Sequence, residues 1–90
     1  MYRIEVAPVA NRQLEKLKGR IGSQDFERLQ EAVVGLAEEP RPQGVRKIKG
    51  EERAYRIRVG NYRVVYEVYE NGKFVLILRV VRRSETTYRQ

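Results

Sequence analysis

The sequence predicts an α+β domain in which an N-terminal strand and a helical hairpin pack on one face of a twisted, mainly antiparallel β-sheet. Before residue 40 apolar residues recur at helical spacing, and after it they alternate with polar ones. Gly60-Asn61 lies between two alternating runs, which is typical of a hairpin with a two-residue turn. The 90 residues suit a single domain, residues 1–90, near the lower size limit for an unaided core.

The first forty residues predict one strand and two helices. Residues 2–6 alternate as a strand does, and Pro8 ends the strand and can occupy the first turn of a helix. Gly19 and Gly22 weaken and stop this helix. Ser23 is the predicted N-cap of the second helix, which Pro40 and Pro42 terminate. The predicted buried stripe of the first helix is Ala10, Leu14, Leu17 and Ile21; that of the second is Phe26, Leu29, Val33, Leu36 and Ala37.

The rest of the chain predicts strands. They are expected at residues 45–49, 53–59, 62–69 and 74–82, with turns at Gly60-Asn61 and Asn71-Gly72. The last strand is apolar on both faces except at Arg79, as a central strand would be. A regular strand would place Phe74, Leu76, Leu78 and Val80 on its core side.

The predicted hairpin brings arginines together. With Gly60-Asn61 as the turn, Arg58 lies opposite Arg63, and Arg56 shares their face. Like charges directly opposite each other destabilise a sheet, by about 0.2–1 kcal/mol per pair. Because guanidinium groups match phosphate oxygens bidentately and stay charged, we expect this face to bind a phosphodiester.

Other side chains extend this site. Arg83 would join the cluster if the last strand stays regular. Lys47 and Lys49 would add positive potential at the rim, although a solvated edge strand explains them equally well. Tyr88 lies in a polar tail and could stack on a base, exchange a proton, or pin the C-terminus to the sheet. The tyrosines expected in the core are Tyr55, Tyr62 and Tyr66.

Composition narrows the class of function. The formal net charge is +7, and residues 1–40 hold 6 basic and 7 acidic side chains whereas residues 41–90 hold 13 and 5. This asymmetry favours a phosphate-binding surface on one structural element. Without cysteine or histidine, the chain lacks the commonest metal ligands and general base, so no metal or cofactor is expected. The start has no signal-peptide core and no segment is apolar for long enough to span a bilayer, so we expect a cytoplasmic protein.

These residues resemble the RelE/ParE toxin superfamily over nearly the whole chain: the strand, the helix pair, Arg-Lys-Ile-Lys-Gly at 46–50, the hairpin at 55–66 and the ending at 82–89. The hairpin motif is shared by RelE-like ribonucleases and ParE-like gyrase poisons. The ending favours the RelE branch, because an arginine after the last strand followed by a tyrosine is similar to the catalytic tail of ribosome-dependent mRNA endonucleases.

The resemblance implies the toxin of a type II toxin–antitoxin pair, which cuts mRNA in the ribosomal A site. A ribose 2′-OH would attack the adjacent phosphate without a metal, leaving a 2′,3′-cyclic phosphate or its hydrolysed product and a 5′-hydroxyl. By this resemblance, the residues at the family's catalytic positions are Arg56, Arg58, Arg63, Arg83 and Tyr88, with Arg82 as the alternative to Arg83 near the leaving group. Those expected to help bind RNA are Lys47, Lys49 and Arg82.

More than one group could act as the general base that accepts the 2′-hydroxyl proton. Lysines often stand on the first hairpin strand of these ribonucleases, whereas an arginine, with a pKa above about 12, is a poor proton acceptor. Tyr88 could serve if guanidinium groups lower its pKa from the usual value of about 10. Alternatively, ribosomal RNA and the arginines orient the hydroxyl and stabilise the transition state, and Glu85 is a third candidate.

Two other functions fit the same residues: a ParE-like inhibitor of DNA gyrase, and a non-catalytic RNA-binding or ribosome-binding module. The resemblance also implies a cognate antitoxin that wraps an extended or helical segment around the helix pair or the sheet edge. A dimeric antitoxin would give a heterotetramer.

Overall fold

The computed structural model describes residues 1–82, so the roles predicted for Arg83, Glu85 and Tyr88 lie outside the described residues. Its elements are β1 (Arg3–Val6), α1 (Pro8–Lys18), α2 (Ser23–Gly35), β2 (Arg46–Lys47), β3 (Ala54–Val59), β4 (Tyr62–Tyr69) and β5 (Phe74–Arg82). None of the helices within this part of the chain is long and apolar enough to span a membrane.

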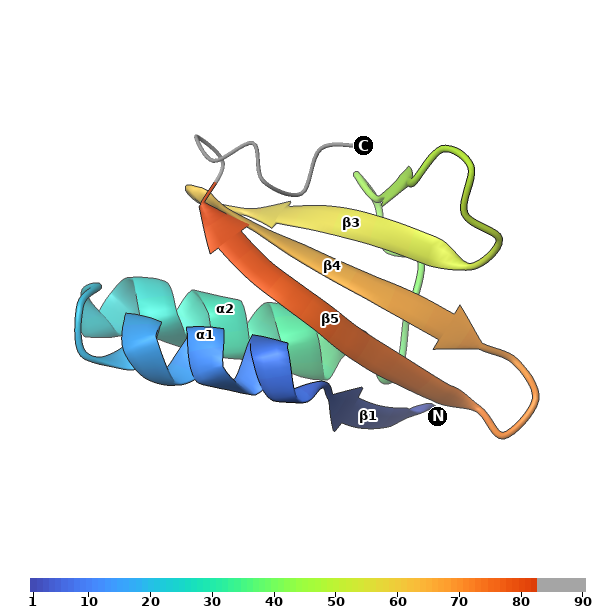
Figure 1. The fold of residues 1–90 in the computed structure, drawn as a ribbon, viewed down its shortest axis with the longest axis horizontal. Coiled ribbons are helices and arrows are strands. Elements are labelled where there is room, and N and C mark those ends of the chain that lie inside the picture. Colours follow the sequence, from blue (N-terminus) through green and yellow to red (C-terminus); the bar gives the residue numbers. More distant parts are fainter. Residues whose placement is uncertain (83–90) are drawn as a thin grey trace.

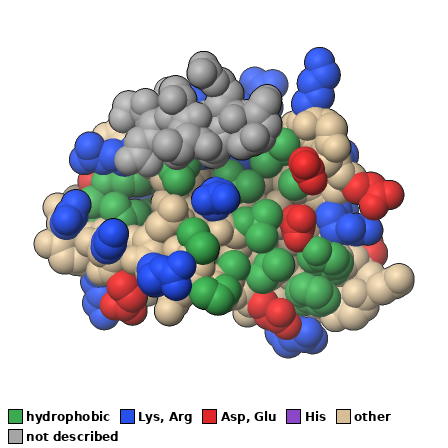
Figure 2. Space-filling model, in the orientation of Figure 1, with side chains coloured by type: hydrophobic (Ala, Val, Ile, Leu, Met, Phe, Trp, Pro, Cys, Tyr) green, Lys and Arg blue, Asp and Glu red, His purple; other side chains and the backbone are tan. Residues whose placement is uncertain are grey.

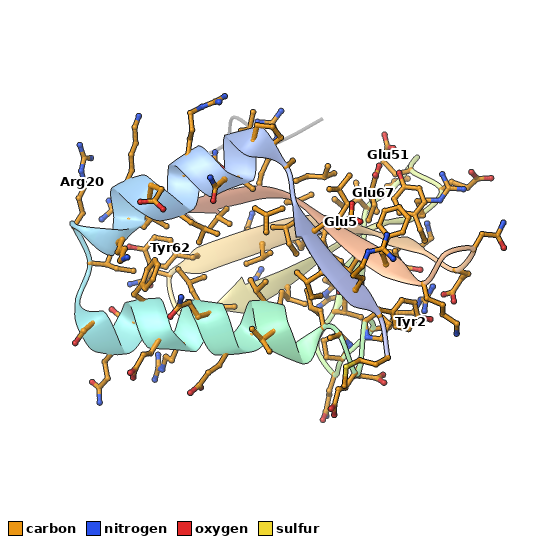
Figure 3. The ribbon with its side chains drawn as sticks, turned by 90° about the horizontal axis from the view of Figure 1, so that it is seen from below. Tyr2, Glu5, Arg20, Glu51, Tyr62 and Glu67 are labelled. Atoms are coloured by element: carbon orange, nitrogen blue, oxygen red, sulfur yellow. The ribbon has the colours of Figure 1, made fainter. Side chains whose placement is uncertain are left out.

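One five-stranded sheet forms the body of the molecule, in the order β1-β5-β4-β3-β2 (Figure 1). β1 runs parallel to β5 and every other neighbouring pair is antiparallel. Both helices lie on the same side of the sheet, α1 against β5 and α2 against β3 (Figure 3). The predicted α+β fold class is therefore confirmed, and within residues 1–82 no helix lies on the other face of the sheet.

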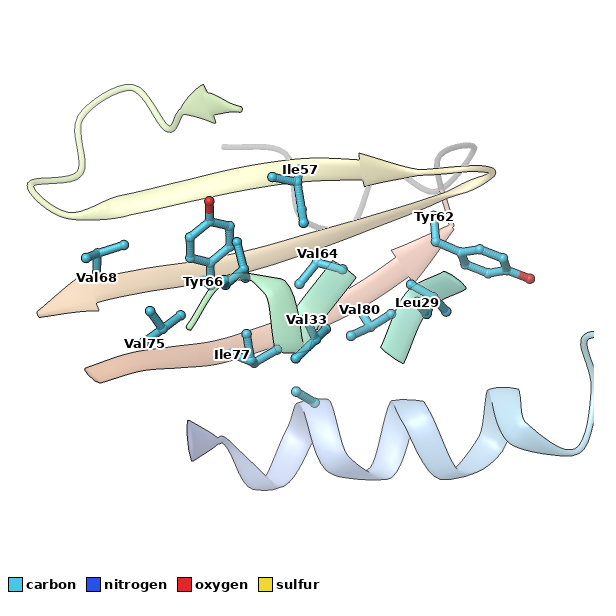
Figure 4. Close-up of a cluster of buried hydrophobic side chains, with 12 residues drawn as sticks. Leu29, Val33, Ile57, Tyr62, Val64, Tyr66, Val68, Val75, Ile77 and Val80 are labelled. Carbon is cyan, nitrogen blue, oxygen red and sulfur yellow. The ribbon is translucent and has the colours of Figure 1, made fainter. Parts of the chain in front are cut away.

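The core lies between this helix pair and the sheet. It is formed by side chains from both helices and from β3, β4 and β5, including fully buried Leu29, Val64 and Ile77 (Figure 4). The three tyrosines assigned to the core belong there: Tyr62 and Tyr66 are buried, and Tyr55 packs against them. Burial raises the pKa of the Tyr66 hydroxyl, which donates a hydrogen bond to the carbonyl oxygen of Pro40 at 2.7 Å.

The β3–β4 hairpin has the predicted register. Val59 pairs with Tyr62, Arg58 with Arg63, Ile57 with Val64 and Arg56 with Val65. Gly60 at the turn has φ +59°, a backbone conformation that glycine adopts without strain. The Gly60-Asn61 turn was sufficient to predict this pairing, because a two-residue turn sets the register of the two strands that it joins.

The predicted orientation of β5 is wrong in its first half. The pairing shifts between Val65, which pairs with Arg79, and Tyr66, which pairs with Ile77, so that Leu78 is an extra residue in a β-bulge. Before the bulge Val75 and Ile77 face the helices instead of Phe74 and Leu76; after it Val80 faces them as predicted. Because β5 is apolar on both sides, its own pattern did not indicate which side is buried.

Two boundaries also differ from the predictions. The N-cap of α2 is Gly22 in extended conformation, and Ser23 is the first helical residue, with no side-chain capping bond. β2 covers only Arg46–Lys47 instead of residues 45–49, because the chain turns at residues 49–50. Pro8 opens α1 as predicted.

A network of side-chain hydrogen bonds joins Tyr2, Arg41, Tyr55 and Glu70. The Tyr2 hydroxyl donates to Glu70 Oε1 at 2.6 Å, and Arg41 donates to Glu70 Oε2 at 2.8 Å and to the Tyr55 hydroxyl at 3.0 Å. The hydrogen bonds from Tyr2 and Arg41 lower the pKa of Glu70. This network joins the first strand and the proline-marked connection to the end of β4.

We therefore expect Glu70→Gln to lower the melting temperature at pH 7. A carboxyl group whose pKa is lowered by folding contributes stability above its unfolded pKa, about 4.3, and loses it as the pH falls through the lowered folded value. Melting temperatures of wild type and variant should converge below about pH 4, whereas Glu31→Gln on exposed α2 should match wild type throughout. A difference that persists unchanged at pH 3 would contradict this assignment.

Candidate nucleic-acid interface

Five arginines gather on the sheet face opposite α1 and α2. Arg46, Arg56, Val65 and Arg79 are paired in sequence across β2, β3, β4 and β5 and form one row. The next row holds Arg58, Arg63 and Val81. Since paired residues point to the same side of a sheet, these side chains share one face, which we call the arginine face: Arg46, Arg56, Arg58, Arg63 and Arg79.

Two members of the arginine face were missed by sequence reasoning. The predicted parity of a regular β5 already placed Arg79 on the side away from the core, but Arg79 was not predicted as a site residue. In the structure it lies on the arginine face because the bulge at Leu78 restores that parity for the last residues of β5. Arg79 is the one charged residue between Phe74 and Val81, a signal that could have singled it out. Arg46 depends on the β2–β3 register, which no tight turn sets, so the sequence did not indicate its partner.

The arginine face combines positive charge with two buried valines. Among residues 1–82, no carboxylate forms an ion pair with Arg46, Arg56, Arg58 or Arg79. The nearest acid along this face, Glu67, accepts a hydrogen bond from the Tyr69 hydroxyl at 2.6 Å. Val65, which pairs with Arg56 and Arg79, and Val81, which pairs with Arg63, are buried. Because opposed cations repel each other, an anion on this face would relieve the repulsion.

The arginines at the opposite end of the same face, Arg3 and Arg53, each contact an aromatic ring and a carboxylate. Tyr69 and Phe74 stack with ring centroids 4.5 Å apart, with Arg53 over Tyr69 and Arg3 over Phe74. Arg3 also forms an ion pair with Glu5 at 2.8 Å. The positive charge available to a ligand therefore lies at the hairpin end of the sheet.

The remaining predicted RNA contacts lie elsewhere. Lys47 pairs with Tyr55, so it is on the helix side of the edge strand, where its ammonium donates to the backbone carbonyl of Glu52 at 3.0 Å and lies over the Tyr55 ring. The predicted place of Lys47 at the rim of the arginine face is therefore wrong. Lys49 is exposed in the turn after β2, and Arg82 pairs with Tyr62 on the helix side.

This geometry can hold and polarise a phosphate. Guanidinium groups donate several hydrogen bonds to phosphate oxygens and stabilise the charge that develops in a phosphoryl transition state. They do not accept protons at physiological pH, and the chain contains no histidine. The arginine face therefore suits binding, orientation and charge stabilisation, with proton transfer left to other groups.

Comparison with known proteins matches the chain to toxins of toxin–antitoxin systems. Residues 4–87 match the family described as ParE toxin of type II toxin–antitoxin system, parDE. Toxin RelE3 of Methanocaldococcus jannaschii is 51% identical over 40 residues, which cover 44% of this chain and only 43% of that relative's length.

Solved structures show the same fold. The archaeal RelE–RelB complex from Pyrococcus horikoshii OT3 contains a chain that is 28% identical, with a TM-score of 0.77 and coverage of 93% of this chain and 97% of that one. The intact E. coli RelBE toxin–antitoxin complex contains one that is 25% identical, with a TM-score of 0.75 and coverage of 94% and 100%.

Proposed function

The chain belongs to the ParE toxin family of type II toxin–antitoxin systems, with a RelE-like fold, and we propose that it is a ribosome-dependent endoribonuclease that cleaves mRNA in the ribosomal A site. The observation that carries the proposal is the arginine face. Three of its members, Arg56, Arg58 and Arg63, stand at the positions that match the family's catalytic motif, and the fold brings Arg46 and Arg79 beside them.

In the proposed reaction the ribose 2′-oxygen attacks the adjacent phosphorus and the bond from phosphorus to the 5′-oxygen breaks. The 2′-hydroxyl proton goes to a base and a proton is delivered to the leaving 5′-oxygen, giving a 2′,3′-cyclic phosphate and a 5′-hydroxyl. Arg63, with Arg56 and Arg58 on the neighbouring strand, would bind the phosphate oxygens and stabilise their added charge. Arg83 would act near the leaving group, and Tyr88 is proposed for proton transfer.

The test is cleavage of a labelled mRNA by the purified protein on ribosomes that hold a chosen codon in the A site. We expect cuts within that codon, and fragments whose new 3′ ends carry a 2′,3′-cyclic phosphate or its hydrolysis product. The same mRNA without ribosomes is the control and should stay intact. Intact mRNA in the ribosome reaction would contradict the proposal.

A second candidate is inhibition of DNA gyrase, because the matching family is named for ParE. Loss of gyrase supercoiling activity in the presence of the protein, together with intact ribosome-bound mRNA, would favour this function. The arginine face could then bind the DNA backbone or an acidic surface of the enzyme, since both are anionic.

We also propose a cognate antitoxin as partner, because the P. horikoshii and E. coli relatives were solved as RelE–RelB and RelBE complexes. A largely apolar groove of about 340 Å³ lies between α1, α2 and the edge strand β1. Exposed valines stand in or beside it: Val6 at 39%, Val9 at 39% and Val34 at 66% exposure. An amphipathic antitoxin segment would bury these side chains, and a dimeric antitoxin would give a 2:2 complex.

We expect Val34→Asp to weaken antitoxin binding at least about tenfold, because a charge would be buried in an apolar contact. Gln24→Asp adds the same charge to exposed α2 outside the groove and should leave the affinity unchanged. Isothermal titration of each variant with the antitoxin measures this. Equal affinities for the two variants would show that the antitoxin docks elsewhere.

A further inference from the structure

A second cationic site lies on the helix side of the sheet, around the end of β5. It is a cavity of about 420 Å³ between α1 and the C-terminal end of β5. Its polar lining consists of Gln13, Lys16, Arg20, Tyr62 and Arg82. In Figure 2, Lys and Arg side chains gather at this end of the molecule, where α1 and α2 meet (left).

The three cations that line the cavity come from two elements. Lys16 and Arg20 are four residues apart along α1 and its C-terminal turn, so they lie on the same side and repel each other. Arg82 joins them from β5. Within residues 1–82, no acidic residue lines the cavity and none of the three cations forms an ion pair.

Two uncharged groups in the cavity add hydrogen-bond donors. The Tyr62 ring is buried, but its hydroxyl is open to the cavity and has no hydrogen-bond partner among the described residues. In Figure 4 this hydroxyl points away from the other core side chains, and Figure 3 places Tyr62 at the same end as Arg20. The Gln13 side-chain oxygen accepts a hydrogen bond from the Val80 amide at 2.7 Å, which leaves the Gln13 NH₂ group as a donor.

The lining therefore selects for an anion. Three cations, a phenol and an amide NH₂ all present hydrogens to the cavity, and the Gln13 oxygen is already engaged by the Val80 amide. A tetrahedral oxyanion would accept hydrogen bonds from these donors and offset the charge of the three cations.

We propose that this cavity binds a phosphate group of the RNA strand held on the arginine face, at a nucleotide away from the scissile linkage. This inference rests on the proposed function. The two sites are adjacent at the end of β5, because consecutive residues belong to them. Val81 pairs with Arg63 on the arginine face, and Arg82 lines the cavity on the helix side of the sheet. An RNA backbone that passes the end of β5 can contact both.

The test measures binding of a fluorescent single-stranded RNA in which every 2′-hydroxyl is methylated, so that it cannot be cleaved. Arg20→Gln should weaken binding about three- to tenfold and lower the slope of log K against log salt by about 0.7, the value for one phosphate contact. Tyr62→Phe should weaken binding about two- to tenfold with the slope unchanged, because it removes a hydrogen bond and no charge. Lys73→Gln, at the far turn before β5, is the charge-matched control and should bind like wild type.

Several outcomes would overturn the proposal. One is RNA binding by Arg20→Gln and Tyr62→Phe that equals that of Lys73→Gln, with circular dichroism showing that all three are folded. Another is that Arg20→Gln abolishes the binding of inorganic phosphate but leaves the affinity for RNA unchanged. The cavity would then be a site for a free anion. If Arg63→Ala weakens RNA binding and the cavity variants do not, the cavity proposal fails and the proposed function stands. If Arg63→Ala also binds like wild type, the arginine face does not hold this RNA strand and the cavity proposal fails, whereas the proposed function is decided separately by cleavage on ribosomes.

Discussion

Arg63→Ala should slow mRNA cleavage on programmed ribosomes by about 10²- to 10³-fold, the usual effect of removing one donor that stabilises transition-state charge. Arg63 pairs with Arg58 on one side and Val81 on the other, so it occupies the middle of the arginine face. The same loss is expected for Arg83→Ala. Single-turnover cleavage rates on ribosomes measure both effects.

Two further variants separate charge from geometry. Arg63→Lys keeps the charge but loses the planar fork, so it should recover only part of the activity. Arg53→Ala removes an exposed arginine that lies over Tyr69, away from the cluster, and should cleave like wild type. Cleavage at the wild-type rate by both Arg63→Ala and Arg83→Ala would rule out these catalytic assignments.

Tyr66→Ala is expected to lower the free energy of unfolding by about 3–5 kcal/mol, as other large-to-small aromatic substitutions in cores do. Tyr66 is fully buried, stacks on Tyr55 with ring centroids 5.9 Å apart, and bonds to the carbonyl oxygen of Pro40. A domain of this size is stable by only about 5–15 kcal/mol, so the variant should unfold at much lower urea concentration. Urea titration followed by circular dichroism gives the value.

Tyr66→Phe isolates the hydrogen bond within this effect. It keeps the ring but leaves the Pro40 carbonyl without its buried donor, which should cost about 1–3 kcal/mol. Tyr69→Phe removes a hydroxyl that bonds to Glu67 in a more exposed position, and a smaller loss is expected. Equal losses for the two phenylalanine variants would show that burial of the Pro40 contact contributes nothing.

The hairpin shows what local patterns specify. Gly60-Asn61 and the alternation on either side of it sufficed to predict each pair from Arg56–Val65 to Val59–Tyr62, because a tight turn and a half-buried face together allow one register. The clustering of Arg56, Arg58 and Arg63 on one face follows from that register alone. The two amphipathic helices were likewise predictable, because each buries one stripe.

The fully buried strand shows the limit of such patterns. β5 is apolar on both sides, so alternation did not reveal the bulge at Leu78, which turns Val75 and Ile77 toward the helices and Arg79 toward the arginine face. β2 has no tight turn joining it to β3, and its pairing alone sets Arg46 beside Arg56 and Lys47 on the other side. In both cases the deciding contacts are with distant residues.

The amino-acid sequence alone predicts the fold class, the hairpin, its three arginines and the resemblance to a toxin superfamily. Each of these depends on residues close together in the sequence or on a contiguous motif. The three-dimensional arrangement decided which side of β5 is buried, added Arg46 and Arg79 to the arginine face, and enclosed Tyr62 with Lys16, Arg20 and Arg82. Those juxtapositions join segments far apart in the chain, and only packing and strand pairing set them.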